Sequence, residues 1–204
     1  MDHITSHNWK AFALAGALVG LLAWPGTSEA QTVTGQAKAA QATVMLGILG
    51  GTTTTTLSDT GTLSGTNDAR DASALSGNIP SLLTVDVLHA TTIGYPDEVD
   101  SEASLGDLAL TVGGNGISAD FAMARALAVL GAPGSGSSSI ANLSINGVPF
   151  VVTGDANQTI AIPGGQVVVN EQTISPSGIT VNAIHVTVSG VADVVIASAT
   201  AGVF

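Results

Sequence analysis

The chain contains no cysteine, and few of its residues are aromatic or charged. Without cysteine it can form no disulfide, no thiolate nucleophile and no cysteine-based metal site. Aromatic residues make up 3% and charged residues 9% of the sequence, whereas hydrophobic residues make up 45%. A core must therefore be built mainly from Val, Ile, Leu and Ala, and the surface from uncharged polar residues. This composition is more typical of an extracellular β protein than of a cytosolic enzyme.

Basic residues are scarce. Four Lys and Arg stand against 15 Asp and Glu, which gives a net charge of −11 at pH 7. A nucleic-acid binder needs a stripe of basic side chains to neutralise phosphates, and binding to an anionic membrane surface needs a basic patch. Lys10, Lys38, Arg70 and Arg125 are too few and too scattered to form either. We therefore expect no nucleic-acid partner.

Residues 1–30 are typical of a secretory signal peptide. Lys10 ends a short polar start, residues 11–23 form an apolar run, and residues 28–30 end in the small residue that a signal peptidase reads. The apolar run is too short for a stable membrane span. We expect cleavage after Ala30 and a mature protein that is secreted or held at the cell surface.

The last third of the chain is typical of short β-strands joined by tight turns. Asn146 and Gly147 separate two apolar runs, and Asn-Gly is the strongest short-range hairpin signal because both turn positions need φ > 0. In residues 179–189 the apolar positions change from odd to even near Asn182 and Ala183, which predicts a β-bulge there. Strands are expected at 138–145, 148–153, 158–162, 166–174, 179–189 and 191–203.

Alternation with period two predicts further strands at 82–93, 99–112 and 117–130. The alanine content of residues 117–130 favours a helix, but bulky and small residues alternate there, which favours a strand whose small face packs close to a neighbour. One face of residues 82–93 should carry Leu83, Val85, Val87, His89, Thr91 and Ile93. One face of residues 117–130 should carry Ile117, Ala119, Phe121, Met123, Arg125, Leu127 and Val129. The threonine run at 52–56 should be an exposed strand or loop, the following residues to 78 are turn-rich, and 131–139 should be a flexible connector.

These elements predict an all-β protein, an antiparallel β-sandwich or meander of about ten strands that follows a cleaved signal peptide. Residues 31–50 are either an N-terminal arm or a first strand, and residues 51–204 are the β-sandwich domain. Residues 31–49 lack an obvious hairpin partner and end in an apolar stretch that needs burial. As an arm, this segment could complete the sheet of a neighbouring copy by strand addition.

Four acidic residues, Asp97, Glu98, Asp100 and Glu102, surround one predicted turn. Carboxylate oxygens at such spacing can hold Ca²⁺, and Asp100 and Glu102 would share a strand face. The pattern is not an EF-hand loop, and a solvated acidic turn is the other interpretation. No other metal or cofactor is expected.

No catalytic residues are predicted, and the chain is expected not to be an enzyme. His89 and His185 are the histidines that remain after cleavage, and two imidazoles could share a metal if the strands brought them together, but no third ligand is evident. Ordinary packed or edge histidines are the alternative. Ser135, in the Gly-Ser-Gly sequence of residues 134–136, belongs to the predicted connector and not to a nucleophile turn.

An ordered series of short segments carries a family resemblance. The segments are residues 144–149 (Ser-Ile-Asn-Gly-Val-Pro), 157–162, 168–172, 181–186 and 192–202, and residues 88–90 and 117–120 fit its central part. The series resembles the choice-of-anchor P family of bacterial surface proteins. The resemblance implies export, attachment through varied C-terminal anchors, and no known enzymatic activity. Because the sequence stops at Phe204 without a sorting motif, hydrophobic tail or basic terminus, we expect free secretion or attachment through other subunits.

The sequence thus predicts a secreted, non-enzymatic structural or adhesive β protein of the cell surface or extracellular matrix. One alternative is a self-assembling filament subunit that uses residues 31–49 for strand addition. The other is a calcium-dependent carbohydrate-binding module that uses the acidic turn. The expected partners are copies of the chain itself, other surface proteins or glycans.

Overall fold

The computed structural model describes residues 31–47 and 50–204, and the expected signal peptide lies outside the described residues. Residues 31–204 form one compact unit. Its strands are β1 (Val33–Met45), β2 (Thr52–Asp59), β3 (Ala69–Ile79), β4 (Leu83–Gly94), β5 (Glu98–Val112), β6 (Asn115–Val129), β7 (Ser135–Ala141), β8 (Ser144–Ile145), β9 (Val148–Pro149), β10 (Gln158–Ile162), β11 (Gly165–Ser175), β12 (Gly178–Val188) and β13 (Ala192–Val203). The predicted all-β fold is confirmed, with thirteen strands in place of about ten.

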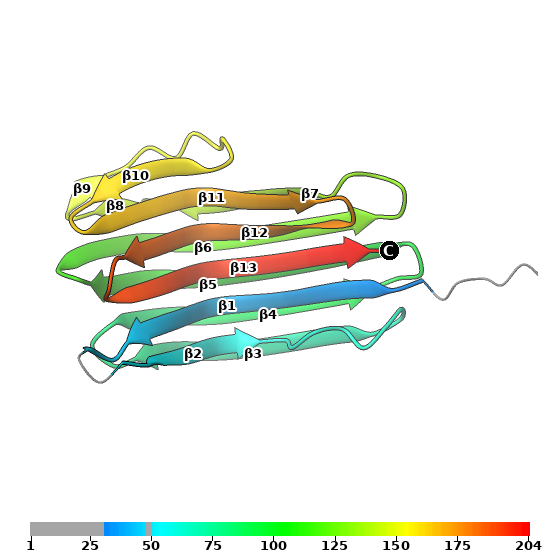
Figure 1. The fold of residues 1–204 in the computed structure, drawn as a ribbon, viewed down its shortest axis with the longest axis horizontal. Coiled ribbons are helices and arrows are strands. Elements are labelled where there is room, and N and C mark those ends of the chain that lie inside the picture. The colour runs from blue at the N-terminus through cyan, green and yellow to red at the C-terminus, as the bar shows by residue number, and fades with distance from the viewer. Residues whose placement is uncertain (1–30, 48–49) are drawn as a thin grey trace, which may run out of the picture. The chain divides into compact units, whose positions relative to one another are not determined.

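Two antiparallel sheets pack face to face (Figure 1). Sheet A has the order β10-β11-β12-β13-β1-β2, and sheet B the order β3-β4-β5-β6-β8-β9 with β7 also paired to β6. The chain enters sheet A, crosses to sheet B between β2 and β3, and returns between β9 and β10. The last strand then pairs with the first, because β13 lies beside β1.

The prediction that residues 31–49 lack a hairpin partner is wrong. The threonine-rich strand β2 pairs with β1 from Lys38↔Asp59 to Met45↔Thr52. On its other side, β1 pairs with β13 from Val33↔Val203 to Val44↔Ala192. The first strand is therefore an interior strand of the chain's own sheet.

One edge strand, β3, was not predicted from the sequence, and the strand predicted at 138–145 covers only the second half of the other, β7. Strand β3 lies in the stretch predicted to be turn-rich, and β7 begins inside the predicted connector at 131–139. Most of their side chains are exposed or half-buried, so their sequences carry no alternation of apolar and polar residues. The Asn146-Gly147 hairpin is confirmed, since both residues have positive φ and β8 pairs with β9 across them.

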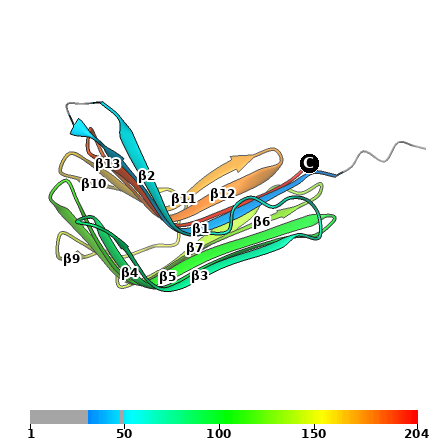
Figure 2. The ribbon, with the colours of Figure 1, turned by 90° about the horizontal axis from the view of Figure 1, so that it is seen from below.

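Both sheets bend along a line that crosses the strands, which we call the crease (Figure 2). In sheet A the crease follows Ser58, Ala39, Ala197, Ala183 and Asn170, where ladder pairing is interrupted on neighbouring strands. Ser58, Ala197 and Asn170 have φ values of 46°, 50° and 51°. This left-handed conformation is rare for residues other than Gly, Asn and Asp, and it turns the strand.

In sheet B the crease passes Leu75, Val87, Asp107, Asp120 and Asn142, and Val87, Asp107 and Asn142 again have positive φ. The predicted change of phase at residues 182–183 is confirmed in position, but it is not a bulge. Asn182 pairs with Ser198 and Ile184 with Ile196, so the register is the same on both sides of the crease.

The crease corrects two predicted strand faces. In β4, Leu83 and Val85 point into the core as predicted, but beyond the crease Leu88 and Ala90 do so, and Val87 is 66% exposed. In β6, Ile117 and Ala119 are buried before the crease, and the buried residues after it are Ala122, Ala124, Ala126 and Ala128. The strand prediction for β6 is confirmed, and its small face packs inward.

The crease also divides the core into two halves, which we name by composition. The alanine half lies toward Val33 and Val203, and its buried residues include Ala37, Ala90, Ala103, Ala122, Ala124, Ala126, Ala128, Ala199 and Ala201. The aliphatic half lies toward Val44 and Ala192, and its buried residues include Leu83, Val85, Leu108, Leu110, Ile117, Val167, Val169, Ile184, Val186, Val194 and Ile196.

Candidate functional site

A row of polar residues crosses sheet A beside the crease. Neighbouring strands place Glu171, Asn182, Ser198, Lys38 and Asp59 in one register. The Asn182 amide donates to Glu171 Oε2 at 2.6 Å, and Lys38 Nζ lies 4.0 Å from Asp59 Oδ2. The outer face of this sheet is the concave side of the bend (Figure 2). The row therefore gathers much of the sheet's charge in a shallow trough.

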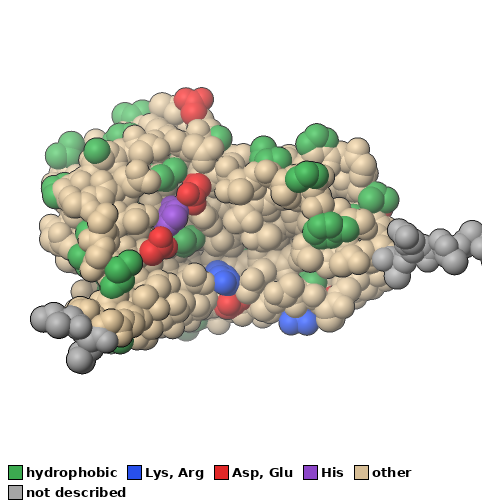
Figure 3. All heavy atoms as spheres, viewed as in Figure 1, with side chains coloured by type: hydrophobic (Ala, Val, Ile, Leu, Met, Phe, Trp, Pro, Cys, Tyr) green, Lys and Arg blue, Asp and Glu red, His purple; other side chains and the backbone are tan. Residues whose placement is uncertain are grey.

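His185 on β12 is the centre of this trough. Its Nδ1 lies 2.9 Å from Oε2 of Glu171 on β11, and its Nε2 lies 3.1 Å from Oδ2 of Asp193 on β13. Glu171 belongs to the alanine half and His185 to the aliphatic half, so this contact spans the crease. The imidazole side chain is 21% exposed. Figure 3 shows a histidine between acidic side chains on this face.

Two opposing effects set the protonation of His185. Burial lowers the pKa of the imidazole, but hydrogen bonds and charge interactions with Glu171 and Asp193 outweigh it and raise the pKa above its ordinary value of 6.5. An imidazolium has two N–H donors, which matches a ring with a carboxylate at each nitrogen. The arrangement therefore favours a fixed cation that joins three strands rather than a free general base.

The acidic turn does not form a cluster. Asp97 lies in the turn before β5, and Glu98, Asp100 and Glu102 follow at alternate positions on β5. Arg125 of β6 binds Asp100 through Nε at 3.1 Å and also through Nη2, and this pairing raises the pKa of Arg125. Within residues 31–47 and 50–204, no three His, Asp or Glu side chains are placed to hold a metal ion. The described residues thus bring no three of these carboxylates together at this turn, and a calcium site there stays a prediction.

The remaining basic groups among the described residues are also paired with acids. His89 of β4 accepts or donates a hydrogen bond with Ser73 of β3 at 3.0 Å, and its Nδ1 lies 3.4 Å from Asp71. The two histidines lie in different sheets and share no ligand. Asp68 accepts from the Ser64 backbone N–H and from Arg70 Nε, and these bonds lower the pKa of Asp68 to about 2.

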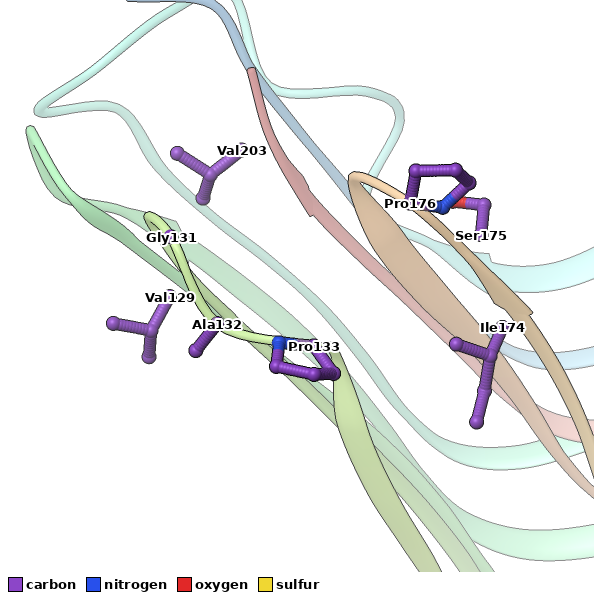
Figure 4. A pocket seen from close by; sticks show the side chains of 8 residues that line it. All are labelled: Val129, Gly131, Ala132, Pro133, Ile174, Ser175, Pro176 and Val203. Atoms are coloured by element: carbon purple, nitrogen blue, oxygen red, sulfur yellow. The ribbon is translucent and has the colours of Figure 1, made fainter.

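A cleft of about 600 Å³ opens at the end of the sandwich near Val203 (Figure 4). Its walls come from the β6–β7 turn and the β11–β12 turn, and its lining is Val129, Gly131, Ala132, Pro133, Ile174, Ser175, Pro176 and Val203. None of these side chains titrates near neutral pH. The cleft can offer apolar contact and one hydroxyl, but no acid–base chemistry.

Sequence reasoning missed the contact of Glu171, His185 and Asp193. The signal available was the pair of tight turns that joins β11, β12 and β13, because turn positions fix the register of neighbouring strands. Glu171 pairs in register with Asn182, not with His185, and reaches the ring only by a diagonal contact across the crease. The alternation of side chains along a regular strand does not predict which way a side chain points where the strand bends at the crease.

No family model, no curated protein and no solved structure matches this chain. The resemblance to the choice-of-anchor P family therefore remains a prediction. In the part of the chain that the structure describes, there is no helix with the length and apolar character needed to cross a membrane.

Proposed function

We propose that the chain is an exported, non-enzymatic structural β protein of the cell surface or extracellular matrix. One observation carries the proposal: four of the five basic side chains among the described residues link neighbouring strands, and the fifth, Arg70, pairs with Asp68 in the preceding loop. Lys38 joins β1 to β2, Arg125 joins β6 to β5, His89 joins β4 to β3, and His185 joins β12 to both of its neighbours. Basic side chains that could otherwise bind a substrate or move protons thus hold neighbouring strands of a sheet together.

The connectivity of sheet A supports the same role. Strand β1 is held on both sides, and β13 is held by β1 and β12. Backbone bonds also join Thr32 N to Phe204 O at 3.3 Å and Phe204 N to Thr32 O at 2.9 Å. A sheet with its first and last strands in its interior resists fraying, which suits a protein that must persist outside the cell.

The proposal is tested in cells that produce the protein. Cytoplasmic, surface and culture fractions are probed with an antibody against residues 31–204, and the N-terminus of the extracellular form is sequenced. We expect extracellular protein that begins at Gln31. Intracellular protein that retains Met1 would contradict the export part of the proposal.

The non-enzymatic part needs a separate test. Cells that lack the protein are complemented with the wild type, with His185→Gln or with Asp155→Asn, and surface cohesion is compared at matched protein levels. A structural protein should restore cohesion with all three. Loss of cohesion in the His185→Gln cells, with the variant folded and exported, would favour acid–base chemistry and oppose the proposal.

The second candidate function is a self-assembling filament subunit. The observation that favours it is the exposed flank at β2 and β3, where two neighbouring strand edges lack partners within the described residues. The N-terminal segment is a poor donor strand, because β1 would have to leave both β2 and β13 before it could join a neighbour.

A further inference from the structure

The two sheets end side by side at β2 and β3, and we call this side of the sandwich the β2–β3 flank. Neither residues 52–58 nor residues 72–79 contain a charge or a proline. Within the described residues, β2 pairs only with β1 and β3 only with β4. Natural edge strands are usually protected by charge, proline, shortness or a covering loop, because their free N–H and C=O groups otherwise pair with another chain.

The opposite flank is protected in these ways. The Gln172 side chain donates to the Gly136 carbonyl of β7 at 3.2 Å. Gln158 binds the backbone of Val151 and Thr153, which holds the segment before β10 against that strand. On the same flank β9 has two residues and ends at Pro149. One flank of the sandwich is therefore protected, whereas the strand edges of the β2–β3 flank are open.

Exposed apolar side chains mark the middle of β3. Leu75 is 87% exposed, and Val87, which lies beside it on β4 at the crease, is 66% exposed. Both are far more exposed than the buried Leu88 and Val85 near them. An apolar pair at the midpoint of an open strand edge is what a strand-pairing interface would bury.

We propose that two copies of this chain pair antiparallel along β3 about a two-fold axis at Leu75. The inference rests on the proposed structural role and gives that role a partner. Antiparallel pairing sets Leu75 beside its copy and places Asp71 opposite Ile79 of the second copy. Parallel in-register pairing would instead set Asp71 beside Asp71, and like charges directly opposite are unfavourable. A two-fold axis needs only one self-complementary surface, which this edge provides.

The absence of cysteine allows a direct test of register. Leu75→Cys, Asp71→Cys and Val151→Cys are each introduced into the protein recovered from its producing cells and oxidised mildly. Residues opposite each other across an antiparallel pair lie close enough for a disulfide. The two Asp71 positions would lie about 26 Å apart, at roughly 3.3 Å for each of eight residues. Val151, which is 79% exposed on the opposite flank, is the matched apolar control.

We expect rapid covalent dimers from Leu75→Cys and none from Asp71→Cys or Val151→Cys. Equal cross-linking at Asp71 would mean parallel pairing and would overturn the proposal. Cross-linking at Val151 alone would place the contact on the other flank and would also overturn it.

A second measurement removes the dependence on oxidation. The mass of the wild type, Leu75→Lys and Val151→Lys is measured by light scattering over a range of micromolar concentrations. Leu75→Lys should weaken dimerisation by at least about tenfold, because it sets two ammonium groups side by side. Val151→Lys should leave it unchanged. A monomeric wild type, or a dimer that Leu75→Lys does not weaken, would refute the pairing.

The outcomes separate the two proposals. An exported protein that stays monomeric would refute the pairing and leave the structural role standing. A protein that dimerises through β3 but remains inside the cell with Met1 attached would refute export and keep the pairing.

Discussion

The two halves of this sandwich are built from the same long strands in one register, but they are packed differently. In the aliphatic half, Leu, Ile and Val side chains from both sheets fill the space between them. In the alanine half, buried alanines lie among larger side chains such as Leu105 and Val181. A Cβ atom at Gly35 of sheet A would collide there with Thr92 and Val99 of sheet B. The alanine half even buries a hydroxyl pair, Thr92 and Ser101, whose oxygens lie 2.7 Å apart.

The difference shows that one topology can be stabilised in two ways. Large side chains remove much apolar area from water, so the aliphatic half depends on the volume that it fills. Small side chains bury less apolar area but allow the two sheets to approach closely. The alanine half therefore depends on the absence of larger side chains between the sheets. The two halves should therefore respond to opposite kinds of substitution, and the predictions that follow run from the largest expected effect to the smallest.

Removing volume should damage the aliphatic half most. Leu110 is 1% exposed, and Leu110→Ala should lower the free energy of unfolding. A loss of about 2–5 kcal/mol is expected, because the change removes transfer energy and leaves a cavity. Urea unfolding measures the effect, and Val151→Ala at an exposed site is the control that should change little. An equally small loss of unfolding free energy in both variants would show that the stability of the aliphatic half does not depend on the volume of its side chains.

Adding volume should damage the alanine half. Gly35→Ala places a methyl group against Thr92, Leu63 and Val99, so we expect a loss of about 1–3 kcal/mol in the free energy of unfolding. Gly65→Ala is the matched control, since a Cβ atom there meets nothing within 4 Å. Calorimetry of the two variants tests this point. A neutral Gly35→Ala would mean that the sheets are not in close contact here.

The boundary between the halves can be tested at Val87, a β-branched residue with φ of 48°. Glycine adopts this conformation without the Cβ penalty, and Val87 buries little, so Val87→Gly should raise the free energy of unfolding by roughly 1 kcal/mol. At Val129, a strand residue with ordinary backbone geometry and 37% exposure, the same change should be destabilising. Urea midpoints that fall for both variants would argue against a left-handed residue at the crease.

The smallest effect concerns the contact that links the halves on the outer face of sheet A. Because the folded-state pKa of His185 is raised, its stabilising contribution is fully present below the unfolded value of about 6.5 and is lost as pH rises through the folded value. Urea midpoints between mildly acidic and alkaline pH should fall by an amount equivalent to about 1 kcal/mol or less. Glu171→Gln should reduce this fall, and Asp155→Asn should not. If the urea midpoint of the Glu171→Gln variant fell by the same amount over this pH range, the pH dependence would come from a group other than His185.

The fold class and most of the strands could be predicted from local pattern. Period two located β4, β5 and β6, and the Asn146-Gly147 pair located a hairpin, because these signals act within a few residues. Strand β3 was not found, because nearly all of its side chains are exposed or half-buried and give no alternation of apolar and polar residues. The inward-facing residues were misassigned after Val85 in β4 and after Ala119 in β6. Where a strand crosses the crease, the inward positions change from odd to even numbers although no extra residue is inserted.

The candidate site was harder to predict. The acidic residues at 97–102 were singled out because they are close in sequence, but Glu98, Asp100 and Glu102 are spread along one face of β5, and Arg125 binds the middle one. Glu171, His185 and Asp193 come together because three strands are in register and bend, which is tertiary information. Only the histidine itself could have been singled out from the sequence.

The pairing of the first strand with the last has a consequence for the order of folding. Strand β1 is made before the other strands, but its ladder to β13 joins Val33 to Val203 and cannot form until residue 203 has been made. Closing so long a loop costs chain entropy before any contact repays it, and such topologies fold slowly. Until β13 arrives, β1 has only the edge strand β2 beside it. The sandwich is therefore completed by the strand that is made last, β13.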